Sequence, residues 1–543
     1  MNDGTIKARY DKLAVDRQWY LTEGMESAKL TIPSIMPSDQ DAALLALRNS
    51  PEDLPKPWQS IGAKGVRNLA AKLGLALFPS TGAFMRYQIA PTLKRALQSE
   101  ERAAQRTTIE RDLAIREQII ADDVESHGVR TKVDQALRQL LVVGNVLIYM
   151  IPKGGLRIFP LNNYVVRRDF AGNVVELIYL ELLEKSTLPE RLKAALVAGG
   201  CECDPETGEL KIEKNKESVP VYTRLRLRGK SFHITQEALG YDVDMEGKNS
   251  VPKNKLPFLP LRMVTIDGED YGRGFVEEIR GDLRSAEELR KAIVIGSLNA
   301  AKVVALVTPG AIVTPKKLME AQNGSAILGR SEDVTMLQQN KHGDFTVAQN
   351  SYSDLKQDLA ASFLLNSAIQ RNAERVTAEE IRRMAEELED ALGGIYSVLS
   401  QELQLPLALR TEDRLIKEGA IGPLDDGTVI PVIVTGLAAI GRGHEFNRFR
   451  EYVAFVREEV AVMDPTIATY FNSRDILERA AIGLGVPIEG LVKSVEQMAE
   501  EQAQAKQDMQ RQQVIEAGAK PFAQVAAKEL GGNVLQQQTQ PSQ

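Results

Sequence analysis

Gly229, Lys230 and Ser231 form the part of the sequence that most resembles a nucleotide site, because a phosphate-binding loop ends in Gly-Lys-Ser or Gly-Lys-Thr. In such a loop another glycine lies five residues before the last one, and the lysine reaches the phosphates. Position 224 is an arginine, and no apolar strand leads into a glycine-rich turn here. The sequence therefore favours an ordinary Gly-Lys turn between strands over an ATP site.

Two groups of carboxylates have the oxygen ligands that a hard metal ion prefers. Asp267 lies close to Glu269 and Asp270, and Asp425 is followed by Asp426. Both groups lie in glycine-containing turns, where solvated carboxylates are the more common interpretation. We therefore expect turns rather than metal sites at both positions.

Cys201 and Cys203 are the only cysteines, and one residue separates them. A zinc site needs further Cys or His ligands at suitable spacing. The histidines are isolated from one another and from the cysteines: His127, His233, His342 and His444. We therefore interpret the cysteines as free thiols in a loop and expect no metal and no cofactor. Because no nucleophile elbow, HExxH or dinucleotide fingerprint occurs either, we expect that the protein is not an enzyme.

Arg371 and Arg375 lie in a mostly small and polar segment, residues 366–376, between two predicted helices. By itself this pattern is typical of a polar loop between helices. A loop that presents arginines between long helices can also contact a polyanion. The residues alone leave both interpretations open.

Length and composition limit the class of protein. A chain of 543 residues suggests three or four folding units. With 43% hydrophobic and 26% charged residues it is an ordinary globular protein, which excludes a disordered, collagen-like or disulfide-stapled chain. The net charge of −7 argues against a large basic face that clamps nucleic acid. The longest apolar window, 140–150, is too short for a membrane span and is interrupted by Gly144 and Asn145.

Hydrophobic periodicity predicts an α+β fold that is predominantly helical. Helices are expected at 5–30 (on the surface), 60–78, 107–126, 129–143, 271–300, 353–365, 377–405, 443–463, 473–482 and from 488 onward. Strands are expected at 146–151, 156–161, 164–169, 174–180, 221–226, 231–234 and 303–307, with further short strands to about 345. Gly172-Asn173 is a hairpin signal, and Gly393-Gly394 should kink the helix that starts after Thr377.

Six long strings have a combined similarity to one known family. They are TIPSIMP at 31–37, PWQSIGAKGVRNLAAKLGLALFP at 57–79, QLLVVGNVLIY at 139–149, IDGEDYGRGFVEEIRGDLRS at 266–285, NSAIQRNAERVTAEEIRRMAEELEDALGGIYSVLSQELQLPL at 366–407 and VTGLAAIGRG at 434–443. In this order they resemble the portal, or head-to-tail connector, proteins of short-tailed podovirus-type bacteriophages. The similarity runs from about residue 5 to 490.

The resemblance implies a homo-oligomeric ring of twelve subunits around an axial channel at one vertex of the virion capsid. Genomic double-stranded DNA would be packaged and ejected through this channel. The implied partners are the terminase motor during packaging, then the tail adaptor protein, and also the scaffolding and major capsid proteins, with no membrane. ATP hydrolysis would belong to the separate terminase, in keeping with the missing phosphate loop.

The portal fold that the resemblance implies has tiers called wing, stem, clip and crown, followed by a helical barrel. Mapped onto this sequence they are 1–270 (wing), 271–300 (stem), 301–347 (clip), 348–365 (stem), 366–376 (channel loop), 377–435 (wing), 436–487 (crown) and 488–543 (barrel helix and tail).

Candidate channel residues follow from this mapping. Arg371 and Arg375 of the channel loop become candidates to face DNA and to limit its back-slippage. Glu277, Asp282 and Glu288 of the stem are candidates for an acidic channel wall, since a basic wall would bind the duplex and slow its passage. In a ring of twelve, the −7 of each chain becomes −84, which suits a conduit in which DNA slides.

Lys316 and Lys317 in the clip are candidates to contact the motor or tail adaptor, although solvated lysines are the more common interpretation. Two other classes of protein stay open at this point. One is a non-viral oligomeric ring scaffold or channel without a DNA role, and the other is an enzyme with an unrecognised site.

Overall fold

The structure is a computed structural model. It describes residues 5–37, 54–79, 84–90, 103–184, 188–201, 218–243, 249–300, 304–337, 342–365, 388, 392, 394–424 and 429–433. The chain divides into two compact units, Met1–Gly443 and His444–Gln543, and every described residue belongs to the first unit. The helices predicted from residue 443 onward, the crown, the barrel and the loop at 366–376 therefore lie outside the described residues.

The largest sheet is antiparallel and has the strand order β4-β5-β6-β7-β8, with β9 paired to β7. Its strands are β4 (Tyr164–Arg168), β5 (Val174–Glu184), β6 (Ser218–Arg228), β7 (Ser231–Ala238), β8 (Tyr241–Val243) and β9 (Ser250–Pro252). The hairpin predicted at Gly172-Asn173 is confirmed, and Gly172 has a φ of +80°. The Asp169 carboxylate accepts the backbone N–H groups of Ala171 at 3.0 Å and Asn173 at 2.8 Å, which fixes this turn.

A smaller antiparallel sheet has the order β10-β2-β3 and belongs to the main hydrophobic core. Its strands are β2 (Asn145–Met150), β3 (Leu156–Phe159) and β10 (Phe258–Arg262). Val146, Leu147 and Ile148 in the central strand β2 are fully buried. This continuous apolar run is typical of a strand covered on both faces.

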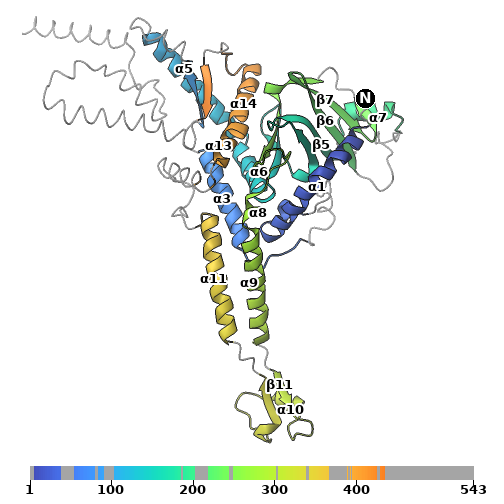
Figure 1. Ribbon diagram of the computed structural model, residues 1–543, viewed down its shortest axis with the longest axis vertical. Coiled ribbons are helices and arrows are strands. Elements are labelled where there is room, and N and C mark those ends of the chain that lie inside the picture. The colour runs from blue at the N-terminus through green and yellow to red at the C-terminus, as the bar shows by residue number, and fades with distance from the viewer. Residues whose placement is uncertain are drawn as a thin grey trace, which may run out of the picture. The chain divides into compact units, whose positions relative to one another are not determined.

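Helices pack on these sheets and on one another (Figure 1). They are α1 (Ile6–Leu30), α3 (Ile61–Leu77), α5 (Ala103–Ser126), α6 (Val129–Val143) and α7 (Glu190–Ala198), with one-turn 3-10 helices at Pro33–Ile35, Leu161–Asn163, Lys253–Lys255 and Ser331–Asp333. The periodicity of 129–143 predicted α6 correctly. The prediction of a surface helix at 5–30 is wrong for one face of α1, where Arg17 is buried. The guanidinium donates to the Leu161 carbonyl at 3.0 Å and to the Tyr10 hydroxyl at 3.1 Å, so its burial is compensated.

Two long helices, α9 (Arg280–Ala300) and α11 (His342–Ser362), lie side by side and form, with the residues between them, the α9–α11 hairpin, residues 280–362 (Figure 1). A short α8 (Phe275–Glu278) precedes α9, so the predicted helix is interrupted at Ile279. The prediction that the second helix begins at 353 is wrong by eleven residues. Its first half has few apolar residues, and Phe345 packs there so closely on Gly296 that a Cβ on the glycine would lie 2.4 Å from the ring.

The tip of the α9–α11 hairpin contains the strand pair β11 (Val304–Val307) and β12 (Val334–Leu337) and the helix α10 (Pro315–Glu320). The strand predicted at 303–307 is confirmed. Short strands were expected across the rest of this segment, but Thr314 and Pro315 instead begin a helix. Proline suits the first turn of a helix because the N–H it lacks would have no partner there.

The helix predicted to end near Leu405 continues, because α13 (Ile395–Leu399), a π-helix (Ser400–Gln404) and α14 (Leu405–Lys417) follow one another directly. Pro406 has no N–H to donate, which should stop a regular helix. The π-turn adapts the hydrogen bonding just before it, since the Leu405 N–H reaches five residues back to the Ser400 carbonyl. The predicted kink at Gly393-Gly394 involves Gly393, which lies outside the described residues.

The strand β1 (Met85–Ile89) pairs antiparallel with β13 (Val429–Ile433), although 340 residues separate them along the chain. Glu117 of α5 accepts the backbone N–H of Tyr87 in β1 at 2.6 Å. Burial raises the pKa of Glu117 to about 7, and its hydrogen bond to Tyr87 and the charge of Arg86 offset only part of this effect. A titratable carboxyl group therefore lies inside the contact between α5 and this strand pair.

Two backbones approach each other closely where α6 ends and α8 begins. Gly144 ends α6 with a φ of +81°, and a Cβ there would lie 2.3 Å from the carbonyl carbon of Arg273. A Cβ on Gly274 would lie 2.6 Å from the Val142 carbonyl oxygen. The buried Asn145 side chain completes the contact, donating to the Gly272 carbonyl at 2.6 Å and accepting its N–H at 2.7 Å. This glycine contact, defined by Gly144, Asn145, Gly272 and Gly274, fixes α8 to the core.

Gly144→Ala should destabilise the protein strongly, because the new methyl group meets backbone that cannot move aside. Gly128 is the matched control: it flanks the other end of α6 with a φ of +62° and has open space around its Cα. Gly128→Ala should cost roughly 1–2 kcal/mol for the left-handed backbone alone. Gly144→Ala should cost at least about 3 kcal/mol. Chemical denaturation measures both, and equal costs for the two variants would contradict the close contact.

Glu117→Gln should remove a pH dependence of stability. The unfolded carboxyl group ionises near 4.5, whereas the folded one keeps its proton to about pH 7, so stability falls as the pH rises through this window. The loss should be on the order of 3 kcal/mol. Glutamine keeps the acceptor for Tyr87 and cannot ionise, so the variant should be more stable than wild type at pH 8 and similar at low pH. Thermal unfolding measured as a function of pH tests this effect. The control is Asp112→Asn, an exposed position on the same helix, whose stability curve should follow that of wild type. A Glu117→Gln curve that runs parallel to the wild-type curve would contradict the assignment.

Candidate functional site

Glu277 of α8 is not a free carboxylate. Its Oε1 lies 3.3 Å from the Arg273 guanidinium, which also pairs with Glu269 at 2.9 Å and lies over the Trp19 ring, 4.8 Å from its centroid. The hydrogen bond from Arg273 lowers the pKa of Glu269. Burial, together with the hydrogen bond to Glu269, raises the pKa of Tyr20 to about 12. Glu277 is thus part of a cluster that joins α8 to α1, and part of its charge is neutralised.

Asp282 and Glu288 are both exposed on α9. Among the described residues neither carboxylate makes an ion pair. Six residues at 100° each place them about 120° apart around the helix axis. The structure therefore brings the two predicted residues onto one helix but not onto one narrow face.

Ion pairs and hydrogen bonds attach the start of α9 to α1 and to the segment before α3. Arg280 pairs with Glu23 at 2.5 Å, and the Glu287 carboxylate accepts the backbone N–H groups of Trp58 at 2.8 Å and Gln59 at 3.0 Å. Sequence reasoning missed Glu287 because its partners lie 229 and 228 residues away. These contacts set the direction in which the α9–α11 hairpin leaves the core.

Lys316 and Lys317 lie on α10 at the tip of the hairpin and are exposed. The Lys316 ammonium approaches Glu320 at 4.0 Å, a weak surface contact. Two large apolar side chains are exposed in the same segment, Met319 at 86% and Leu328 at 89%. The predicted lysines therefore belong to a surface that offers both positive charge and apolar contact.

Arg371 and Arg375 lie outside the described residues, which end at Leu365 on this side of the loop. The other three channel candidates, Glu277, Asp282 and Glu288, lie on α8 and α9. What the structure does describe is the end of α11, whose last carbonyls contact α3.

Two of the sequence patterns that suggested enzyme sites are turns in the structure, whereas Asp425 and Asp426 lie outside the described residues. Gly229 and Lys230 form the two-residue turn between β6 and β7, and Gly229 has a φ of +62°. The turn after Asp267 contains Gly268 at +87°. Cys201 is a free thiol, and Cys203 lies outside the described residues. Within the described ranges no group of three or more His, Cys, Asp or Glu residues is arranged to hold a metal ion.

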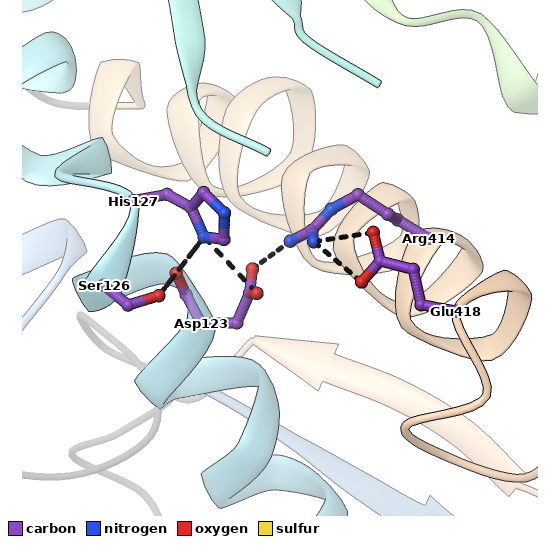
Figure 2. A network of polar contacts seen from close by, with 5 residues as sticks. All are labelled: Asp123, Ser126, His127, Arg414 and Glu418. Atoms are coloured by element: carbon purple, nitrogen blue, oxygen red, sulfur yellow. Dashed lines mark hydrogen bonds and ion pairs between the residues drawn. The ribbon is translucent and has the colours of Figure 1, made fainter. Parts of the chain in front are cut away.

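Ser126, His127 and Asp123 are close together at the end of α5 and could be mistaken for a catalytic triad (Figure 2). A triad needs the hydroxyl and the carboxylate on different ring nitrogens. Here the Ser126 hydroxyl at 3.2 Å and the Asp123 carboxylate at 3.4 Å both face Nδ1 of His127. Asp123 also pairs with Arg414 of α14, which contacts Glu418 at 3.2 Å, so the network joins two helices (Figure 2).

A second arginine supports the same helix contact. Arg116 of α5 pairs with Glu412 of α14 at 2.6 Å and also donates to the Gly422 carbonyl at 2.5 Å.

Among the described helices, none is both long enough and apolar enough to cross a membrane.

Comparison with known proteins gives consistent matches along the chain. A family model described as bacteriophage head to tail connecting protein matches residues 3–492. The portal protein of Escherichia phage T7 is 38% identical over 510 residues, covering 93% of this chain and 91% of that protein. The portal protein of Enterobacteria phage T3 is 38% identical over 533 residues, covering 97% and 95%. The portal protein of Enterobacteria phage SP6 is 28% identical over 534 residues, covering 97% of both chains.

Among solved structures, a chain from the neck of an empty GTA particle has a TM-score of 0.33 and 10% identity, covering 79% of this chain and 90% of that one. The family model and the relatives above 30% identity each span most of the sequence, so they decide the family. The chain belongs to the bacteriophage head-to-tail connecting proteins, and it is a virion component with phage portal function.

Proposed function

We propose that twelve copies of this chain close into a ring at one capsid vertex and that genomic double-stranded DNA passes through its axis during packaging and ejection. Membership in the head-to-tail connecting family is the observation that carries the proposal. In this proposal the chain performs no catalytic step, and the terminase motor hydrolyses ATP.

Exposed apolar side chains on the α9–α11 hairpin support a ring. Leu298 on α9 is 61% exposed and Val347 on α11 is 67% exposed, and Ile295 lies one turn from Leu298. Two helices that pack mainly on each other leave their outer apolar positions in water, which is unfavourable unless another surface covers them. A second copy, related by rotation about an axis, brings the same hairpin alongside, and such a head-to-tail contact closes into a ring.

We propose the following tiers for the subunit. We assign α9 and α11 to the stem, residues 301–341 between them to the clip, and 366–376 to the channel loop. The β4–β9 sheet, the β10-β2-β3 sheet and the β1–β13 pair, together with α1, α3, α5, α6 and α14, form the wing, with 436–487 the crown and 488–543 the barrel. Scaffolding and major capsid proteins are the proposed partners of the subunit within the capsid.

The clip surface that contains Lys316 and Lys317 is the proposed contact for the terminase and then the tail adaptor. Exposed Met319 on the same helix, and exposed Leu328 elsewhere in the clip, support this role, because partner contacts combine buried apolar groups with charges at their edge.

The acidic residues of α9 support a channel wall that repels phosphate. A wall rich in Lys or Arg would displace the counterions of DNA and bind it, which would slow its passage. Exposed Asp282 and Glu288 keep negative charge on two sides of the helix, so a stem helix that lines the channel presents at least one of them over a wide range of helix rotation.

Asp282→Lys and Glu288→Lys, tested separately, should show which side of α9 faces the DNA. Because the two positions are about 120° apart, we expect one variant to slow packaging and the other to have a smaller effect. The slowing should weaken as salt is raised, as phosphate contacts do. Single-molecule packaging measures the rate, and Asp11→Lys on the exposed face of α1 is the control. Wild-type rates for both α9 variants would contradict an acidic wall built by this helix.

Reversing the charge of Arg371 and Arg375 tests the role of the channel loop. If these arginines hold DNA transiently, the double variant Arg371→Glu, Arg375→Glu should package DNA but lose it from filled heads before the tail is attached. The genome content of heads after packaging stops measures retention. Arg228→Glu, at an exposed position in the wing, is the control for charge alone. Unchanged retention in the double variant would remove the loop from the mechanism.

A further inference from the structure

The end of α11 has an unusual backbone conformation. Leu364 has a φ of +53° and is one of two non-glycine residues with positive φ in the described chain. Its N–H donates to the Ala361 carbonyl at 2.9 Å, and the Leu365 N–H donates to the Ala360 carbonyl at 2.8 Å. Helices often end this way, but with glycine at the left-handed position. A leucine adopts this conformation only where surrounding contacts hold it.

Two side chains of α3 bind the carbonyl groups at this point. The Asn68 amide donates to the carbonyls of Phe363 and Leu364, both at 3.2 Å. The Lys72 ammonium donates to the Leu364 carbonyl at 2.8 Å. The Lys72 side chain is only 5% exposed, although lysine is seldom buried. Keeping an ammonium group away from water is costly, so the contact with this carbonyl is a specific feature of the fold.

Gly65 of α3 leaves room for the ring of Phe363, the residue before Leu364. Phe363 is fully buried, and a Cβ on Gly65 would lie 2.3 Å from its ring. Phe275 of α8 contacts the same ring, with centroids 5.9 Å apart. Gly65, Asn68 and Lys72 are spaced by three and four residues, which puts them on one stripe of α3. This stripe holds the end of α11 by packing and by hydrogen bonds at once.

We propose that Asn68 and Lys72 are positioning residues that clamp the left-handed turn at Leu364 and thereby set the direction in which the chain enters residues 366–376. The inference rests on the proposed function of Arg371 and Arg375 in that segment. The clamp acts at Leu364, two residues before this segment begins, and α3 belongs to the core, so the core fixes the point at which the chain leaves α11. DNA retention then depends on side chains of α3 that need not touch DNA.

Lys72→Met tests the clamp against a matched variant on the same helix, Lys64→Met, whose side chain is exposed. Amide hydrogen exchange of the peptide covering 366–376 in assembled protein should become roughly tenfold faster in Lys72→Met, the factor expected for losing a hydrogen bond from a charged donor. Lys64→Met should match wild type. DNA retention in filled heads should fall several-fold for Lys72→Met alone.

Leu364→Gly separates positioning from plain stability. Glycine adopts positive φ readily, and this gain offsets the loss of the partly buried leucine side chain, so thermal stability should change little, while the freer turn lowers DNA retention and speeds exchange in 366–376. A merely structural role would move stability and retention together. Wild-type exchange in 366–376 for both Lys72→Met and Leu364→Gly would overturn the clamp. If exchange changes but charge reversal at Arg371 and Arg375 leaves retention intact, the clamp stands and the proposed role of the arginines fails.

Discussion

The close approach of two backbones at Gly144 and Gly274 is the constraint on which the rest of the structure depends. The contact leaves no room for a Cβ on either residue, and Asn145 joins both sides by hydrogen bonds. It fixes α8 against α6 and β2, and α8 leads directly into α9. Two of the six strings quoted in the sequence analysis, 139–149 and 266–285, meet at this contact, which gives a physical reason for Gly144, Gly272 and Gly274.

The core thus directs the two long helices α9 and α11 outward. Apolar side chains on these helices are exposed in a single chain, and further copies of the chain could cover them. Arg280, Glu287 and their partners hold the base of α9, while Phe363 seats the end of α11 on α3. Farther out, apolar residues such as Leu298 and Val347 remain exposed in the single chain. A subunit that is rigid at the base and incomplete along its hairpin is suited to ring assembly, where the neighbouring copy supplies the missing cover.

Sequence patterns predicted helices and strands best where local periodicity matches burial. They failed where contacts with residues far away in the sequence determine the structure. The apolar stripe of 129–143 predicted α6, and Gly172 predicted a hairpin, because both signals are local. The first half of α11 lacks such a stripe, and its periodicity therefore placed the start of this helix eleven residues too late. Pro406 concealed the continuation into α14, because a π-turn is not visible in a residue pattern. The candidate acids were found on an exposed helix, whereas Lys72 looked like an ordinary polar position of α3: its carbonyl partner lies 292 residues away.

The most direct test of the account is single-particle electron microscopy of the purified full-length chain, which shows whether the incomplete hairpins find each other. We expect closed rings of twelve copies with an axial opening wide enough for duplex DNA and with the α9–α11 hairpins of neighbouring copies in contact. Single copies or open chains at every protein concentration, or closed rings whose axis is blocked to a duplex in all classes, would contradict it.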